Sequence, residues 1–164
     1  MITANALPVV SPIIGDQQVC ENGFVKFSSA TSGGGWISSN ANIATVGGTG
    51  LVRGISAGTA TIRYRVINAS GCVTTVTRDI TVNALPVLTA ITGTQQVCVG
   101  ASAQLNNSYN AAGTAVWISG NTAVATIDAH GLVSGIAAGS AIINYSVTSA
   151  SGCSTYVSTA FTVN

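Results

Sequence analysis

The stretch Gly58-Thr-Ala-Thr-Ile-Arg-Tyr-Arg-Val66 alternates small or apolar side chains with polar ones. Every second residue from Ala60 to Val66 would face one side of a β-strand, while Thr61, Arg63 and Arg65 would face the other. The same inner pattern returns at residues 141–147. A period of two predicts a strand with one buried and one solvated face.

This strand belongs to a sequence that is written twice. NALPVVSPIIGDQQVC at residues 5–20 returns as NALPVLTAITGTQQVC at residues 83–98, and later landmarks follow in the same order in both copies. The second copy carries three extra residues between Cys98 and Trp117. At roughly 80 residues, each copy is long enough to bury its own core. The repeat predicts two tandem domains, residues 1–83 and 84–164.

The junction between the copies is short. Residues 80–86 read Ile-Thr-Val-Asn-Ala-Leu-Pro, and Pro86 biases the residue before it toward an extended conformation. We therefore expect the two domains to form a semi-rigid, elongated arrangement. Residues 2–8 resemble this junction, so residues 2–4 are interpreted as the last strand of a preceding domain and the chain as a piece of a longer array.

Each copy contains short apolar runs separated by Gly, Ser and Asn, and no window shows the helical period with caps. The pattern predicts an all-β fold of two immunoglobulin-like antiparallel β-sandwich domains. The strands expected in the first copy are residues 7–14, 23–29, 35–39, 43–46, 50–54, 59–67 and 73–82.

Charge is scarce, with five Lys and Arg against four Asp and Glu. Nucleic-acid binding proteins need clustered Lys and Arg, so this class is excluded as a partner. No apolar run approaches the 18 or so residues that a membrane-spanning helix requires, so no membrane insertion is expected in this segment. No export signal opens it. A surface solvated by hydroxyl and amide side chains is typical of exported proteins.

Each copy holds two cysteines. Three pairings are open, and the repeat favours bonds within each copy, Cys20 with Cys72 and Cys98 with Cys153. Four buried free thiols, or a zinc site without supporting spacing, are the alternatives. Disulfides indicate an oxidising compartment, so an extracellular or cell-surface location is expected.

Aromatic residues recur at equivalent positions. Trp36 and Trp117, each followed by Ile-Ser, are interpreted as core residues together with Tyr64 and Tyr145, because a repeated position indicates architecture. The alternative is an exposed tryptophan that stacks on a sugar.

The runs WISSNANIATV at residues 36–46 and GLVRGISAGTATIRY at residues 50–64 resemble the group 2 bacterial immunoglobulin-like domain. Residues 117–128 and 131–143 repeat the pattern, so the resemblance covers both copies. It implies a β-sandwich, repeat-rich surface adhesins such as those of Bacteroidetes, and no catalytic residue or cofactor to carry over.

Few residues suggest chemistry. His130 follows Asp128 in a turn whose first-copy equivalent carries Thr49, so both are interpreted as turn residues and not as a catalytic pair. Calcium would need clustered oxygen ligands, and Asp16 with Glu21 or Asp79 are the candidates, without a loop motif. No metal or cofactor is therefore expected.

Two surface features invite binding hypotheses. Four cations of the first copy are a candidate ligand face for acidic polysaccharide, or they merely solvate the sheets. They are Lys26, Arg53, Arg63 and Arg65. Threonines along the final strand (Thr75, Thr77 and Thr81) suggest ice binding as a further hypothesis, but a single strand interrupted by Asp79 supports it poorly.

The sequence thus favours a non-catalytic structural repeat, a stalk or spacer of a large secreted or cell-surface bacterial adhesin. The expected partners are neighbouring repeat domains of the same chain and a surface glycan or protein. The alternative is a carbohydrate- or protein-binding module, for which Tyr109 in the longer stretch of copy two is a candidate contact. An enzyme is not expected.

Overall fold

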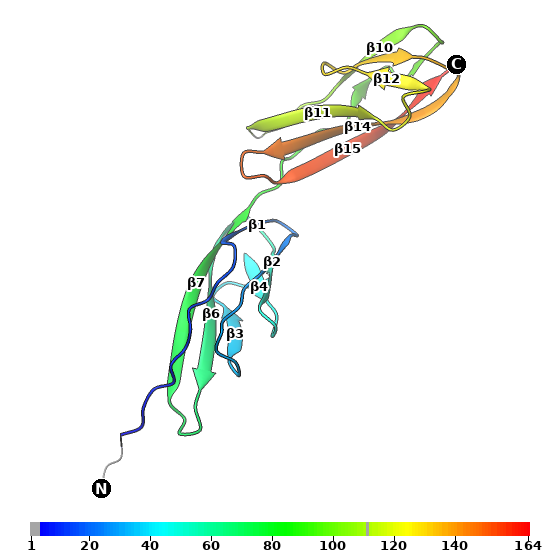
Figure 1. Ribbon diagram of the computed structural model, residues 1–164. Coiled ribbons are helices and arrows are strands. Elements are labelled where there is room, and N and C mark those ends of the chain that lie inside the picture. Colours follow the sequence, from blue (N-terminus) through cyan, green and yellow to red (C-terminus); the bar gives the residue numbers. More distant parts are fainter. Residues whose placement is uncertain (1–3, 111) are drawn as a thin grey trace. The chain divides into compact units, whose positions relative to one another are not determined.

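The computed structural model describes residues 4–110 and 112–164, and it divides into two compact units, Met1–Ala84 and Leu85–Asn164 (Figure 1). The boundary falls one residue beyond the one expected from the repeat. Throughout the described residues the regular structure is β, with no helix, and each unit is an immunoglobulin-like β-sandwich. The strand expected at residues 2–4 lies, apart from Ala4, outside the described residues.

In the first unit one sheet has the order β1-β7-β6-β3 and the other the order β2-β5-β4. Neighbouring strands are antiparallel except β1 and β7, which are parallel. The strands are β1 (Gln18–Cys20), β2 (Phe24–Lys26), β3 (Gly35–Ser38), β4 (Ala44–Val46), β5 (Leu51–Gly54), β6 (Gly58–Ile67) and β7 (Val73–Asn83).

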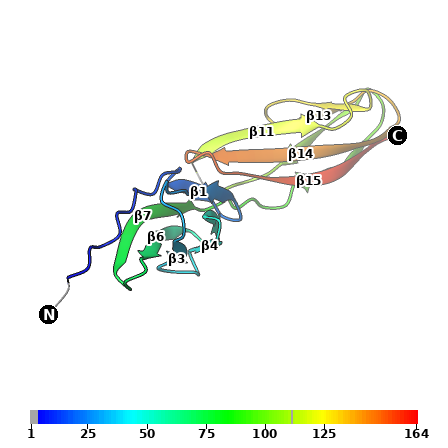
Figure 2. The ribbon, with the colours of Figure 1, turned by 60° about the horizontal axis from the view of Figure 1, so that its bottom comes forward.

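The second unit repeats this plan with the sheets β11-β14-β15-β9 and β12-β13-β10-β8. Figure 2 shows β11, β14 and β15 side by side in the first of these. The strands are β8 (Thr92–Gly93), β9 (Gln96–Val97), β10 (Ser102–Asn106), β11 (Gly113–Ser119), β12 (Ala125–Ile127), β13 (Leu132–Gly135), β14 (Gly139–Ser149) and β15 (Ser154–Val163).

The predicted alternation is confirmed, because the inner residues of β6 and β14 are buried and most of the outer ones are exposed. Each unit encloses a separate hydrophobic cluster between its two sheets. Phe27 is fully buried in the first cluster, and Leu105, its equivalent in the repeat, is fully buried in the second.

The Gly-Leu-Val landmark is explained by a glycine that touches both sheets. Gly50 and Gly131 have φ of +83° and +86°, a region that disfavours other residues. A Cβ at Gly50 would lie 2.3 Å from the Phe27 carbonyl oxygen and 3.0 Å from the Trp36 ring. The motif therefore needs glycine, because the backbone at this position lies close to Phe27 and to the Trp36 ring.

The expected strand at residues 7–14 is wrong. In this stretch only Ile14 pairs, in an isolated bridge with Ser28. Pro8 and Pro12 have no N–H to donate to a ladder, which explains why a β-prone run stays outside the sheets. The strand that opens the first sheet is instead β1, further along the chain, and it runs parallel to the closing strand β7.

Candidate functional site

The four cations proposed as one ligand face do not share a face, which corrects that expectation. Lys26 and Arg53 lie on β2 and β5 of one sheet, whereas Arg63 and Arg65 lie on β6 of the other. The buried faces of these two sheets meet in the core, so their outward side chains point in opposite directions. The sequence indicated outward cations correctly but not which sheet each strand joins.

Two of the cations are engaged locally. The Lys26 ammonium donates to the Thr49 carbonyl, and in the second unit the Gln104 side-chain amide donates to the equivalent His130 carbonyl at 2.7 Å. A neutral amide thus takes the place of the lysine ammonium, so the role that the two side chains share is to hold this turn. The Arg53 guanidinium lies 5.7 Å from the Phe24 ring centroid, a cation–π distance.

The fifth cation, Arg78, is also structural. Its guanidinium donates to the carbonyl oxygens of Ile13 at 3.1 Å and Gly15 at 2.6 Å, and it lies 5.8 Å from the Phe27 ring centroid. Arg78 therefore fastens the segment before β1 to the closing strand β7.

Arg65 lines a surface hollow on the outer face of β3 and β6. The hollow has a volume of about 220 Å³ and is open because two of its positions carry no side chain. Its lining residues are Gly33, Gly35, Ile37, Arg65 and Ile67. A guanidinium beside half-exposed aliphatic side chains suits a small carboxylate-bearing group, although the hollow is smaller than most ligand pockets. The run of three glycines before Trp36 was the sequence signal for it.

The second unit does not form this hollow from equivalent residues. Aligned on Trp36 and Trp117, Gly35 corresponds to Val116, Arg65 to Ser146 and Ile67 to Thr148. Val116 is 51% exposed and fills the place that Gly35 leaves open. The guanidinium is absent there as well, so the hollow is particular to the first unit.

The four aromatic residues expected in the core lie there. Tyr64 and Tyr145 are buried, and Trp36 and Trp117 are half-buried and pack against the two clusters. Each tryptophan lies 4.5 Å, centroid to centroid, from the tyrosine of its own unit. Tyr109 packs near the core tyrosine and does not stand out in a loop as an aromatic contact. Its ring centroid lies 6.5 Å from that of Tyr145, and its backbone forms an isolated β-bridge with Leu88.

His130 and Asp128 occupy the β12–β13 turn, as predicted. The Asp128 carboxylate accepts hydrogen bonds from the backbone N–H groups of His130 at 2.8 Å and Leu132 at 2.9 Å. The bond from Leu132, followed by that from His130, lowers the pKa of Asp128 below its ordinary 3.8. The carboxylate shapes the turn, and in the first unit Gly47 takes its place.

Two of the three carboxylates proposed as calcium ligands, Glu21 and Asp79, take part in backbone or strand contacts. Glu21 accepts from the Ala57 N–H at 2.9 Å, and Asp79 accepts from the Thr61 hydroxyl at 2.7 Å. Across residues 4–110 and 112–164, no three His, Cys, Asp or Glu side chains gather as a metal site. In the same residues no helix is long and apolar enough to cross a membrane.

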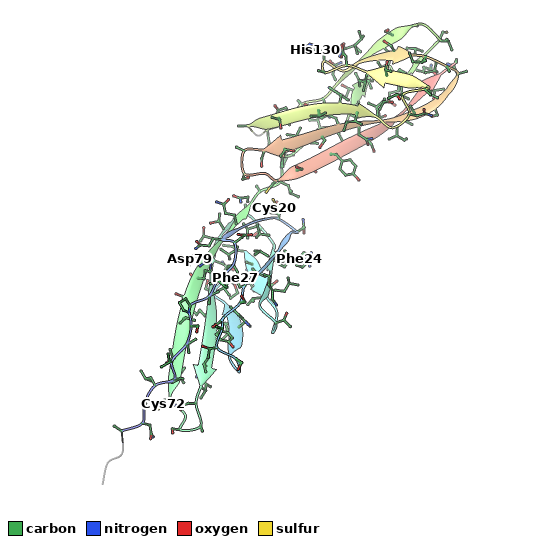
Figure 3. All side chains as sticks on the ribbon, in the orientation of Figure 1. Cys20, Phe24, Phe27, Cys72, Asp79 and His130 are labelled. Atoms are coloured by element: carbon green, nitrogen blue, oxygen red, sulfur yellow. The ribbon has the colours of Figure 1, made fainter. Side chains whose placement is uncertain are left out.

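The cysteine pairing predicted within each repeat is wrong. Cys20 and Cys153 each take part in a disulfide, whereas Cys72 and Cys98 carry free thiols. Cys20 pairs with Asn83 at the end of β7, and Cys72 precedes the first residue of the same eleven-residue strand. At about 3.3 Å per residue the two lie roughly 30 Å apart, far beyond the 7 Å or so that a disulfide spans (Figure 3).

The second repeat shows the same separation. Val97 pairs with Val163 at the end of β15, so Cys98 lies beyond that end, and Cys153 precedes the first residue of β15. The prediction failed because sequence alone placed the first cysteine near the start of the closing strand. The parallel pairing of β1 with β7 and of β9 with β15 moves it to the other end.

Comparison with known proteins gives the family of the first repeat. Ice-binding protein 1 of Shewanella frigidimarina (strain NCIMB 400) is 34% identical over an alignment of 130 residues, which covers 73% of this chain and 15% of that protein. A C-terminal fragment of intimin, solved with the intimin-binding domain of its translocated receptor, covers 96% of this chain and 65% of its own length (16% identity, TM-score 0.49). Domains 4 and 5 of the S-layer protein SbsC cover 94% and 98% (19% identity, TM-score 0.41). Residues 9–71 match the bacterial Ig-like domain (group 2), and this confirms the resemblance for the first repeat.

Proposed function

We propose that this chain is a load-bearing spacer, a pair of non-catalytic repeats in a secreted or cell-surface bacterial protein whose functional part lies in another segment. The observation that carries the proposal is the parallel pairing of the opening and closing strands in each unit, β1 with β7 and β9 with β15. The bacterial Ig-like match and the partial match to an ice-binding protein support this setting, since the chain spans 15% of that relative.

Parallel terminal strands resist a pull along the chain. A force applied to the two ends of a unit draws the first and last strands past each other, so the hydrogen bonds between them are loaded in shear and must break together. In the first unit Thr81 donates to Gln17 and Glu21 donates to Asn83, at 2.8 and 3.0 Å. In the second unit Thr162 donates to Gln95 and Val99 donates to Asn164, the corresponding bonds, both at 3.0 Å.

The proposal extends to location and adhesion. Cys20 and Cys153 each take part in a disulfide, and such bonds persist in oxidising compartments, which supports an extracellular protein. A stalk of an adhesin is the setting that best uses modules resistant to tension. Catalysis is not proposed, because the one histidine lies in a turn and three of the four carboxylates, Glu21, Asp79 and Asp128, make backbone or strand contacts.

Single-molecule stretching of the chain between reference domains, in reducing buffer, tests the proposal. We expect two separate unfolding events, each lengthening the chain by roughly 280 Å for about 80 residues at 3.6 Å per residue. The variant Val99→Pro removes the N–H that donates to Asn164 and should lower the unfolding force of the second unit only. Val99→Ala keeps that N–H and is the matched control.

Two results would reject the spacer. One is unfolding of both units at forces too low to record, and the other is an unchanged force in Val99→Pro. Either would show that the terminal strands do not carry the load.

The hollow beside Arg65 supports a second candidate, a module that binds an acidic glycan. The variants Arg65→Ser and Gly35→Val install the residues of the second unit, and Gly35 has open space for a side chain without a positive φ. On an array of acidic and neutral glycans the spacer predicts no reproducible ligand. A glycan bound by the chain, lost in both variants and kept in Arg63→Asn, would establish the binding module instead.

Ice binding by the chain itself is not proposed. On the outer face of the first sheet Thr75 pairs with Arg65, and Thr77 pairs with Arg63, so cations interrupt the threonine row. The purified chain should therefore show no more thermal hysteresis than a control protein that does not bind ice. A clear gap between its melting and freezing points would show that the chain itself binds ice.

A further inference from the structure

One sheet of the second unit ends in a strand that is long and has a neighbour on one side only. β11 stands at the end of the order β11-β14-β15-β9 and pairs with β14 along its whole length, Gly113–Ser119 (Figure 2). It has seven residues, whereas its counterpart β3 in the first unit has four. A long edge strand presents a row of backbone N–H and C=O groups with which another strand can pair.

The register shows which backbone groups of β11 lie open. Gly120 donates to the Ile142 carbonyl at 2.8 Å, so by alternation Val116 also exchanges its bonds with β14. Ala115 and Trp117, on either side of Val116, therefore point their N–H and C=O groups away from β14. In the part of the chain that the structure describes, no other strand or hydrogen bond reaches these groups.

This edge lacks the usual protection against pairing. Proteins commonly protect an exposed edge with lysine, proline or a bulge, but Gly113–Ser119 contains no charged residue and no proline, and its register with β14 is unbroken. In residues 85–164 the only Asp, Glu, Lys or Arg is Asp128. Val116 and Ile118 are each 51% exposed on the outer face of the strand. Another strand can therefore approach without meeting charge.

The matching edge of the first unit is less suited to pairing. Gly34, which corresponds to Ala115, already donates its N–H to the Tyr64 hydroxyl at 2.8 Å. Arg63 and Arg65 also stand on the outer face of β6, directly beside β3. Two copies joined at β3 would carry like charges on both sides of the joint, so the open edge is particular to the second unit.

We propose that β11 is a dimerisation edge, at which β11 of one molecule pairs antiparallel with β11 of a second copy and joins their two sheets. A two-fold axis at Val116 places this residue opposite its own counterpart. Ala115 of each copy then exchanges its outward backbone bonds with Trp117 of the other. The side chains that meet across the joint are uncharged, with an apolar pair at its centre.

A second copy is the occupant because the edge is complementary to itself. The open groups belong to two residues that flank the proposed axis, so each copy offers the other what it needs. The contact is isologous and closes on itself. At the far side of the sheet β9 has two residues and pairs with β15, so the joined sheet ends there and the assembly stops at a dimer. The inference does not rest on the proposed spacer, and either can fail alone.

Sedimentation equilibrium of the whole chain over a range of concentrations tests the dimer. All samples carry Cys72→Ser and Cys98→Ser, so that free thiols do not join the copies. We expect a reversible dimer that is lost in Val116→Lys, because two ammonium groups then face each other at the axis. Ile37→Lys is the matched control, since Ile37 is 50% exposed on the edge strand of the first unit, and this variant should keep the dimer.

Cysteine cross-linking in the same background tests the register. Val116→Cys places two thiols directly opposite each other, in a cross-strand pair whose Cβ atoms lie about 4.5–5.5 Å apart. Mild oxidation should give a dimer that a reductant separates. Ile118→Cys is equally exposed but lies two residues from the axis, so its two copies stand roughly 13 Å apart along the strands and should link far less.

Unfolding curves that match the parent chain show that the lysine variants are folded, and the cross-link reports the register without any loss of binding. A chain that stays monomeric at every concentration would overturn the proposal. So would a dimer that Val116→Lys leaves unchanged or that Ile37→Lys abolishes. Equal cross-linking at positions 116 and 118 would show random collision in place of the proposed strand pairing.

Discussion

The two repeats bury the same tyrosine but cover its hydroxyl side differently. In the first unit, Gly34 donates its N–H to the Tyr64 hydroxyl, which donates to the Thr31 carbonyl, both at 2.8 Å. In the second unit the chain is three residues longer, β11 continues to Gly113, and the ring of Tyr109 packs near Tyr145. The two cores use the same buried tyrosine, whereas the residues around its hydroxyl differ with the length of one loop.

The outer faces diverge further than the rims. The first unit displays Arg63 and Arg65 where the second displays Asn144 and Ser146. In the second unit, Ile142 and Tyr156 are instead exposed on this sheet, at 49% and 69%. Divergent faces over a constant core fit the proposed spacer, because in that role tension would pass through the backbone pairing and not through the outward side chains.

The largest expected effect comes from substitutions in the two cores. Ile62→Ala and Ile143→Ala each remove a fully buried side chain and should cost the altered unit about 2–5 kcal/mol. Hydrogen exchange read by mass spectrometry should show faster exchange in β6 and β7 for the first variant and in β14 and β15 for the second. Equal acceleration in both units would contradict two separate cores.

A reciprocal exchange at the rim has a smaller effect. A Cβ at Gly34 would lie 2.4 Å from the Tyr64 ring, so Gly34→Ala should destabilise the first unit by about 1–3 kcal/mol through overpacking. Ala115 is the second-unit equivalent, and Ala115→Gly should cost only about 0.5–1 kcal/mol through added backbone freedom. Chemical unfolding curves measure both, and equal costs would mean that Tyr64 is not the contact that demands glycine.

The smallest difference concerns pH. Asp128 has a lowered pKa in the folded state, so its stabilising effect is present above its ordinary value of 3.8 and is lost as the pH falls toward the folded value. Gly47 provides no such carboxylate in the first unit. Asp128→Asn should therefore flatten the acid limb of the second unit's stability curve, followed by hydrogen exchange between pH 2.5 and 5. An acid limb that is identical in the variant and the wild type would show that the Asp128 carboxylate does not stabilise the turn.

Much of this molecule could be predicted from its sequence. Side-chain alternation in residues 58–66 gives the buried face of β6 directly, and the repeat gives two sandwiches. Alternation carries no information about which strands pair, so it could not reveal that Arg53 and Arg63 lie on different sheets. The parallel pairing of β1 was also hidden, because three residues leave no readable pattern. That single missing pairing reversed the assignment of the cysteines.

The position of the cysteines at opposite ends of each repeat is the central claim, and disulfide mapping tests it most directly. Free thiols are alkylated without reduction, and combined trypsin and chymotrypsin cleavage, at Arg and at Tyr, Phe and Trp, separates all four cysteines. We predict alkylated Cys72 and Cys98 in the monomer and no linked peptide between cysteines of one repeat. A Cys20–Cys72 or Cys98–Cys153 linked peptide would contradict the strand pairing on which this account depends.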